Sequence, residues 1–359
     1  MLKFAPYFLL ILGSLAHAEI SWFSGAQKAD VTGEVLDAGD ILVQSYQLAY
    51  SGKEGPWTVE STIGYSHYDL TYVPVLSGNT QQLEEGTFQT NVGVTYQWNS
   101  SFSGTLNIAA YDGFAEYRSI WISEYYRQQF IGFPEEYYAP DPHGESIGAS
   151  FRWDYLPGAG SATFNLGLSR DEVAPGWSFN SATAVPEPDR EELYTFSGGA
   201  RAEQAINGWL KTEVDVTARK TSDRDGRYGI KNTWAAAAGP VTFRVAGGFS
   251  YEAPAFDAIY GTAIVDWKFH PQWSVHLGYR AYSDSGEVQT SGFNATAPAV
   301  DSAEIFTGVL WDRGDLSISG GIGYLTSDYE ALNEDNTFFG NLYRDRDWKT
   351  FRLAASYRF

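Results

Sequence analysis

The sequence predicts an all-β protein: a closed, antiparallel up-and-down barrel of about 16 strands that spans a membrane. Three observations point to this fold class. The chain ends in a strand with one apolar face, short turns alternate with longer loops, and no stretch after residue 18 is apolar enough for a transmembrane helix. Residues 19–359 are predicted to form one domain, because no Gly- or Pro-rich linker divides them.

The C-terminal strand carries the clearest of these signals. Counting back by twos from the last residue gives only apolar or aromatic side chains, namely Phe359, Tyr357, Ala355, Leu353 and Phe351. The positions between them are mostly polar, and a period of two is typical of a strand with one apolar and one wet face. A strand at the very end of a chain must pair with a distant segment to complete a sheet, and a barrel provides that partner.

This ending resembles that of bacterial outer-membrane β-barrel proteins, whose last strand ends in Phe with Tyr two residues earlier, here Phe359 and Tyr357. The resemblance implies that the two residues form a signal read by the barrel-assembly machinery. It also implies contact with outer-membrane lipid and lipopolysaccharide. The expected location is the outer membrane of a Gram-negative-type bacterium.

The N-terminus has the features of a removable signal peptide. Lys3 gives a positive start, residues 7–12 form an apolar run, and Ala16-His17-Ala18 gives a small-residue cleavage site. The run is far shorter than the ~20 residues that a spanning helix needs, which argues against the alternative of an uncleaved anchor. We therefore expect residues 1–18 to be removed by cleavage near Ala18.

Composition fits an exported barrel and excludes one class of partner. Aromatic residues make up 16% of the chain, 37 residues are glycine and none is cysteine. A membrane protein without spanning helices must be a closed barrel, because hydrocarbon offers no other way to satisfy backbone N–H and C=O groups. The formal net charge is −20, and loss of Lys3 with the signal peptide makes it −21. Such acidity argues against a nucleic-acid partner.

Two kinds of connection alternate along the chain. The short ones are rich in turn-forming residues and are predicted to be periplasmic turns: 51–56, 99–101, 157–160, 206–208, 239–240, 270–272 and 312–315. The others are mostly longer and more acidic, as extracellular loops are: 74–86, 113–145, 172–190, 221–226, 252–257, 284–300 and 327–347. An even strand number requires one more strand between Ile20 and Leu36, centred on Asp30 to Leu36. The total is then about 16, with about 14 or 18 as alternatives.

Alternate residues form apolar stripes that end in aromatic side chains. One stripe is Ile147, Ala149, Phe151, Trp153 and Tyr155, and others begin at Phe88, Val241, Trp273 and Leu316. We expect the stripes to face lipid and their aromatic ends to form two girdles at the membrane interfaces. A soluble β-sandwich also alternates, but it explains neither the terminal Phe nor the signal peptide.

The opposite strand faces carry charged residues and are predicted to line the interior. The expected pore-lining residues are Arg152, Arg201, Lys211, Glu213, Asp215, Arg219, Arg244, Arg280 and Arg352. A charged inner face indicates a wet lumen, and about 16 strands enclose an aqueous channel. The alternative is that these charges pair with one another and fill a plugged barrel.

The connection 113–145 is the longest and, with the inferred first strand counted, the third extracellular loop. Its residues 116–131 have the spacing of a short amphipathic helix. By rank and composition this loop resembles the third loop of porins, which folds into the barrel as a constriction. The resemblance places four residues at that constriction: Glu124, Arg127, Glu135 and Glu136. A helix that lies as a lid over the mouth is the alternative.

Acidic residues crowd the predicted outer loops, and carboxylate oxygens suit Ca²⁺ or Mg²⁺. No loop has the regular spacing of a dedicated cation site, so we expect a solvated acidic rim, no cofactor and at most loosely bound divalent ions. A hydrolase built on the barrel is the second function class to test. Asp141, His143 and Ser146 are close in sequence, but no motif of barrel lipases or proteases accompanies them, and we expect no enzyme.

Together these features predict a porin-like channel for passive diffusion of ions or small hydrophilic solutes. A non-conducting structural or adhesive barrel is the first alternative, and an outer-membrane hydrolase is the second. A homotrimer is one assembly that such a channel could form.

Replacing Phe359 with Asp should impair assembly, because the variant puts a charge in the lipid-facing stripe and removes the terminal ring. Heat-modifiable migration on a gel measures the share of closed barrel. Equal amounts of heat-modifiable barrel in variant and parent would contradict the assignment of this strand.

Overall fold

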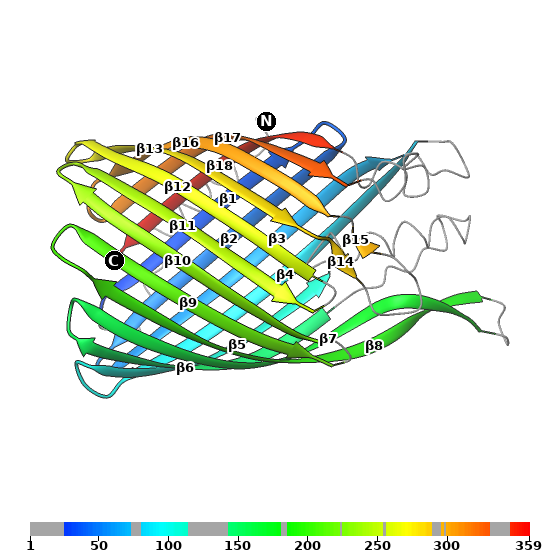
Figure 1. Ribbon diagram of the computed structural model, residues 1–359, viewed down its shortest axis with the longest axis horizontal. Coiled ribbons are helices and arrows are strands. Elements are labelled where there is room, and N and C mark those ends of the chain that lie inside the picture. The colour runs from blue at the N-terminus through cyan, green and yellow to red at the C-terminus, as the bar shows by residue number, and fades with distance from the viewer. Residues whose placement is uncertain are drawn as a thin grey trace.

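The protein is a closed β-barrel (Figure 1). The computed structural model describes residues 25–72, 80–113, 143–180, 185–222, 225–253, 256–288, 296–297, 299–330 and 345–359. Within these residues, sixteen antiparallel strands form the barrel, and β14 and β15 form a separate two-stranded sheet. In the same part of the chain, no helix is long and apolar enough to cross a membrane.

The strands account for most of the described chain. Their bounds are β1 (Gln27–Asp37), β2 (Ile41–Glu54), β3 (Trp57–Tyr72), β4 (Gln81–Gln97), β5 (Phe102–Gly113), β6 (His143–Leu156), β7 (Gly160–Asn180), β8 (Val185–Ala205), β9 (Leu210–Thr221), β10 (Gly226–Ala238), β11 (Val241–Glu252), β12 (Phe256–His270), β13 (Trp273–Asp284), β14 (Glu287–Val288), β15 (Thr296–Ala297), β16 (Val300–Asp312), β17 (Leu316–Tyr329) and β18 (Arg346–Arg358). The predicted fold class and strand number are confirmed. The inferred first strand is also confirmed, since β1 contains Asp30 to Leu36.

Each barrel strand pairs with the strands before and after it in the chain, with β16 following β13 in the sheet. The two ends of the chain close the barrel, because β1 pairs with β18 from Lys28 opposite Arg358 to Asp37 opposite Lys349. A bidentate ion pair reinforces this seam next to the β1–β2 turn. The Arg346 guanidinium donates to the Asp40 carboxylate over 2.9 Å from Nη2 and 3.2 Å from Nε, and the Arg346 side chain is only 2% exposed.

The predicted periplasmic turns all connect strands at one end of the barrel, the left end in Figure 1, where the C-terminus also lies. Side chains shape two of these turns. The carboxamide oxygens of Asn99 and Asn207 each accept hydrogen bonds from backbone N–H groups two and three residues later, at 2.8–3.1 Å. In other turns Gly158 and Gly314 have φ values of 77° and 89°, which only glycine adopts without strain.

One predicted loop proves wrong. The segment 172–190 was expected to be a loop, but β7 continues to Asn180 and β8 begins at Val185, so the hairpin projects beyond the barrel rim (Figure 1). The pairing is irregular between Val173 and Gly176, where Pro175 interrupts the ladder. Outside the membrane, a two-stranded ribbon needs no apolar stripe, so the sequence there lacks the alternation that marks the other strands.

Other loop boundaries also differ from the predictions. β4 already begins at Gln81, β17 extends to Tyr329, and the connection 284–300 contains the paired strands β14 and β15. The predicted helix at 116–131 lies outside the described residues.

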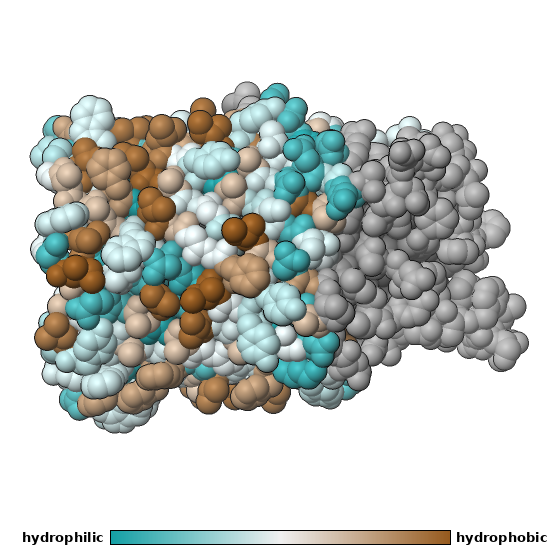
Figure 2. Space-filling view, viewed as in Figure 1, coloured by the Kyte–Doolittle hydropathy of each residue, from teal (hydrophilic) through white to brown (hydrophobic). Residues whose placement is uncertain are grey.

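Large apolar side chains are spread over the outer face, and Figure 2 shows them on one side of the barrel. Leu166 and Ile322, for example, are 60% and 59% exposed. A water-soluble protein rarely exposes so continuous an apolar surface. Aromatic residues concentrate near the strand ends, as predicted. The end of the barrel with the short turns carries Trp57, Trp98, Trp153, Trp267 and Trp273, and the opposite end carries Tyr65, Phe88, Tyr194, Tyr228, Tyr251 and Tyr324. This arrangement matches the apolar band and aromatic girdles of a transmembrane barrel.

Candidate functional site

The inner face of the barrel is the candidate functional site. Alternate residues of each strand point inward, and the register aligns the inward residues of neighbouring strands. On β9 the predicted residues Lys211, Glu213, Asp215 and Arg219 share one side, whereas Val216 on the other side is 41% exposed on the apolar outer face. The other predicted pore-lining residues hold the equivalent inward positions on their strands: Arg152, Arg201, Arg244, Arg280 and Arg352. Their part in conduction stays a prediction.

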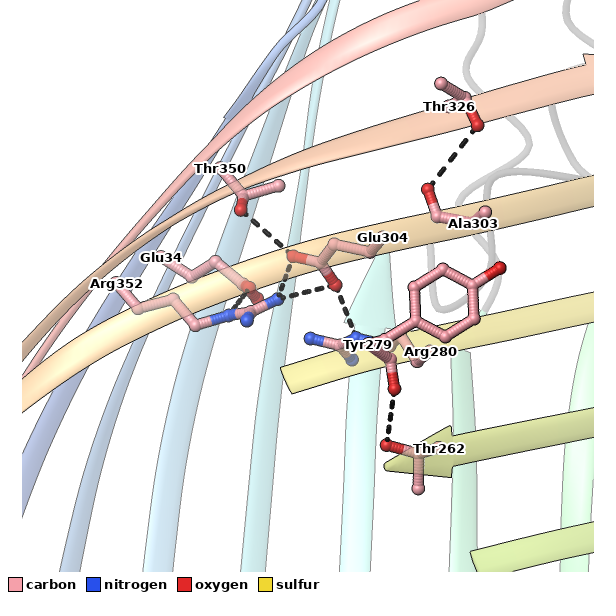
Figure 3. Close-up of polar contacts among 9 residues, drawn as sticks. All are labelled: Glu34, Thr262, Tyr279, Arg280, Ala303, Glu304, Thr326, Thr350 and Arg352. Carbon is pink, nitrogen blue, oxygen red and sulfur yellow. Dashed lines mark hydrogen bonds and ion pairs between the residues drawn. The ribbon is translucent and has the colours of Figure 1, made fainter. Parts of the chain in front are cut away.

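A buried carboxylate organises one side of this inner face (Figure 3). Glu304 on β16 is 2% exposed. It pairs with Arg280 on β13 and accepts a hydrogen bond of 3.1 Å from Arg352 Nη2 on β18. The Thr350 hydroxyl donates to the same carboxylate over 3.0 Å. Arg352 also donates from Nε to Glu34 on β1 over 2.5 Å, so the cluster crosses the seam between the two chain ends.

The neighbouring residues leave room for this cluster. A Cβ at Gly323, on β17, would lie 2.8 Å from a Glu304 carboxylate oxygen and 2.4 Å from the Thr350 hydroxyl. Phe306 lies over Gly278, and the guanidinium carbons of Arg280 and Arg352 are 5.1 and 5.6 Å from its ring centroid. Because two arginines and a hydroxyl compensate it, the Glu304 charge is tolerated at a depth that would otherwise cost several kcal/mol.

A second network of ion pairs lies nearer the periplasmic end, on β6, β8 and β9. Acidic and basic side chains alternate along its contacts. Arg152 bonds Asp154 at 3.0 Å and approaches Glu203 at 3.8 Å, and Arg201 bonds Glu203 at 3.3 Å and Glu213 at 2.5 Å. On the next strands, Arg244 bonds Asp266 at 2.8 Å. The predicted arginines thus face carboxylates of the same inner wall, and Asp215 lies opposite Arg201 and Lys231 in the register.

Farther from the short turns than this second network, the inner face of β2–β8 carries mainly uncharged groups, and sequence reasoning missed them. Its inward positions carry amide side chains on four strands, namely Gln47, Gln89, Asn91, Asn107 and Asn165. A cavity of about 610 Å³ lies along β1–β7, and a second one of about 780 Å³ extends from β5 to β13. Isolated Asn and Gln residues in amphipathic strands give no motif, so only the strand register could have brought them together.

Other predicted site residues are placed as follows. Glu124, Arg127, Glu135 and Glu136 lie outside the described residues. The Tyr357 and Phe359 rings are in edge contact, 4.9 Å apart, and the Phe359 N–H donates to the Gln27 carbonyl oxygen over 3.0 Å. The terminal residue is therefore hydrogen-bonded to the start of β1, and its role as an assembly signal stays a prediction.

The histidine-based hydrolase site gains no support from the geometry. His143 is the first residue of β6 rather than a loop residue, and it lies 3.6 Å from the Glu172 carboxylate. Ser146 is three residues further along the strand, on the opposite face, so the two side chains point away from each other. Across the described ranges, no three His, Asp or Glu side chains gather in a way that could hold a metal ion.

Comparison with solved structures finds barrels of the same architecture. CdiB from Acinetobacter baumannii superposes with a TM-score of 0.56 at 8% identity, over 93% of this chain and 60% of that chain. The chain therefore spans 60% of the length of CdiB. OprB from Pseudomonas putida, in its low-pH structure, has a TM-score of 0.50 at 9% identity, over 93% of each chain.

No protein-family model matches the sequence, and no curated protein matches it either. Identities this low show a shared fold. The shared architecture is the closed antiparallel β-barrel that the sequence predicts.

Replacing Glu304 with Ala should lower the free energy of unfolding by about 1–3 kcal/mol. The decrease in unfolding free energy stays modest because the Arg280 side chain is half-exposed and can be hydrated by water in the lumen once its partner is removed. Urea unfolding of the barrel in lipid vesicles, followed by tryptophan fluorescence, measures it. Glu192→Ala is a matched control, since Glu192 pairs with Arg170 at an exposed site and its loss should leave the transition unchanged. Equal stability of the Glu304 variant and the parent would show that the cluster does not brace the wall.

Proposed function

We propose that this protein is a porin-like channel of the bacterial outer membrane, through which ions or small hydrophilic solutes diffuse passively. The observation that carries the proposal is the contrast between the two faces of one closed sheet. The outer face presents Leu, Ile, Phe and Trp side chains, and the inner face presents charged and amide groups. A charged inner face of a barrel with about 16 strands is typical of a water-filled interior.

The ion pairs bear on the alternative of a plugged barrel. In a plug, paired side chains would be packed away from solvent. Arg201, Arg244 and Arg280 instead keep 43%, 51% and 47% of their side-chain surface exposed although each bonds a carboxylate. The inner charges thus support a hydrated wall rather than a filled core.

The same proposal includes features that rest on the sequence. The signal peptide would be cleaved near Ala18, and the assembly machinery would read Tyr357 and Phe359. The third loop would narrow the channel with Glu124, Arg127, Glu135 and Glu136 facing the wall. Lipid, lipopolysaccharide and loosely bound Ca²⁺ or Mg²⁺ at the acidic loops are the proposed surroundings, and a homotrimer the proposed assembly.

In planar bilayers, the purified protein should give large, steady openings. Because most inner arginines bond a carboxylate, the reversal potential in a salt gradient should show weak selectivity at high salt. At low salt the acidic chain, with its net charge of −20, should enrich cations at the mouth, since screening lengthens to about 30 Å at 0.01 M. Silence in correctly folded, heat-modifiable preparations would favour the structural barrel. Strong anion selectivity at low salt would show that the inner arginines dominate the field.

A further inference from the structure

The uncharged wall inside β2–β8 has the properties of a binding surface. Its two cavities, of about 610 and 780 Å³, adjoin each other, since Ser146 and Ser169 line both. Gln47, Gln89 and Asn91 line the first cavity, and Asn107 and Asn165 line the second. Serine and threonine hydroxyls lie beside these amides, among them those of Thr62, Ser146 and Ser150.

The amide side chains on this wall form no hydrogen bonds with other described residues of the protein. In the described part of the chain, none of these five amide side chains has a hydrogen-bond partner, whereas nearby hydroxyls such as Ser45 and Ser66 bond each other at 3.0 Å. Each amide offers two N–H donors and one carbonyl acceptor. The wall therefore presents donors and acceptors in mixed order to the lumen.

The charged residues beside the amides have hydrogen-bond partners of their own. Glu34 accepts from Arg352 at 2.5 Å, and Asp171 accepts from the Tyr111 hydroxyl at 2.9 Å and from the Ser169 hydroxyl at 3.1 Å. At the far end of the second cavity, Arg227 bonds Glu252 at 2.6 Å. Glu34 and Glu252 are thus neutralised by arginines, and Asp171, whose partners are neutral hydroxyls, keeps its charge at one edge of the first cavity.

Glycines give the second cavity its depth. Gly148 and Gly167 are directly opposite each other in the register, and Gly199 lies one strand further on. A Cβ at Gly148 would come within 2.5 Å of the Asn107 carboxamide oxygen, so the Asn107 side chain lies across this glycine. The tyrosine ring of Tyr260 lies over Gly248 at the edge of the cavity and adds an apolar surface.

We propose that this wall binds a neutral, polyhydroxylated solute, such as a monosaccharide or disaccharide. Each hydroxyl of such a solute both donates and accepts, which matches free amides better than it matches a wall of fixed charges. The proposal names a solute class for the channel and in that sense rests on the proposed function, but binding itself can be measured without conduction.

The test uses sucrose as the neutral probe and gluconate and glucosamine as charged probes. Isothermal titration calorimetry on the detergent-purified barrel should show saturable sucrose binding, with both charged probes at least about tenfold weaker. The double variant Gln89→Ala/Asn91→Ala should weaken sucrose binding by about tenfold or more, because it removes two hydrogen-bonding groups. In bilayers, sucrose should block the ion current with the same concentration dependence.

A second variant separates filling of the cavity from misfolding. A Cβ at Gly64 would lie 3.7 Å from the Tyr46 carbonyl oxygen and 3.8 Å from the Gln89 Cβ, so Gly64→Leu has room for its Cβ and places an apolar side chain at the first cavity. Gly320→Leu is the matched control on the outer face, where the nearest atom is Leu353 Cδ1 at 4.0 Å. Sucrose binding should be lost in the first variant and kept in the second.

Two outcomes overturn the inference: equal affinity for sucrose in parent, Gly64→Leu and double variant, or tighter binding of a charged probe. If the barrel conducts ions but neither binds sucrose nor is blocked by it, the sugar-binding proposal is wrong and the channel function still stands. If the barrel shows no conductance but binds sucrose as described, the channel function is wrong and the sugar-binding proposal still stands.

Discussion

The pairing of β1 with β18 is the constraint on which the rest of the structure depends. In hydrocarbon, an unpaired strand edge would leave a row of N–H and C=O groups unsatisfied, each at a cost of several kcal/mol. Closure removes that edge, and it explains why both chain ends are amphipathic strands. Two ion pairs stabilise the same seam at different positions along the strands, one between Arg346 and Asp40 and one between Arg352 and Glu34.

Closure also decides where chemistry can occur. Once the sheet is closed, every second residue faces lipid and must be apolar, so polar groups can gather only inside. The inside divides into a wall braced by Glu304 with two arginines and a wall of free amides and hydroxyls. The first wall stabilises the strands next to the seam, and the second offers hydrogen bonds to whatever fills the lumen. One sheet thus carries a wall that braces the strands and a wall whose hydrogen-bonding groups face the lumen.

The sequence predicted most of the fold because a lipid-facing strand leaves a strict pattern. The apolar alternation of residues 351–359 and the turn chemistry around Asn99 and Gly158 each have a local physical cause, so they could be recognised without tertiary information. The β7–β8 extension could not, because a ribbon in water has no apolar stripe. Of the inner residues, charged ones such as Arg280 stand out in an amphipathic strand. Their partners and the free amides depend on register, which couples positions as distant as Glu34 and Arg352.

The alternation of lipid-facing and water-facing residues is the central claim, and the absence of cysteine from the chain makes it directly testable. Single cysteines can be placed at each position from Thr163 to Ser169 on β7, in protein reconstituted into sealed vesicles. The rate of reaction with a charged, membrane-impermeant maleimide should alternate. Thr163, Asn165, Gly167 and Ser169 positions should react quickly, and Phe164, Leu166 and Leu168 positions should hardly react. Uniform rates along the strand, or fast reaction at Leu166, would contradict a closed barrel with a water-filled interior.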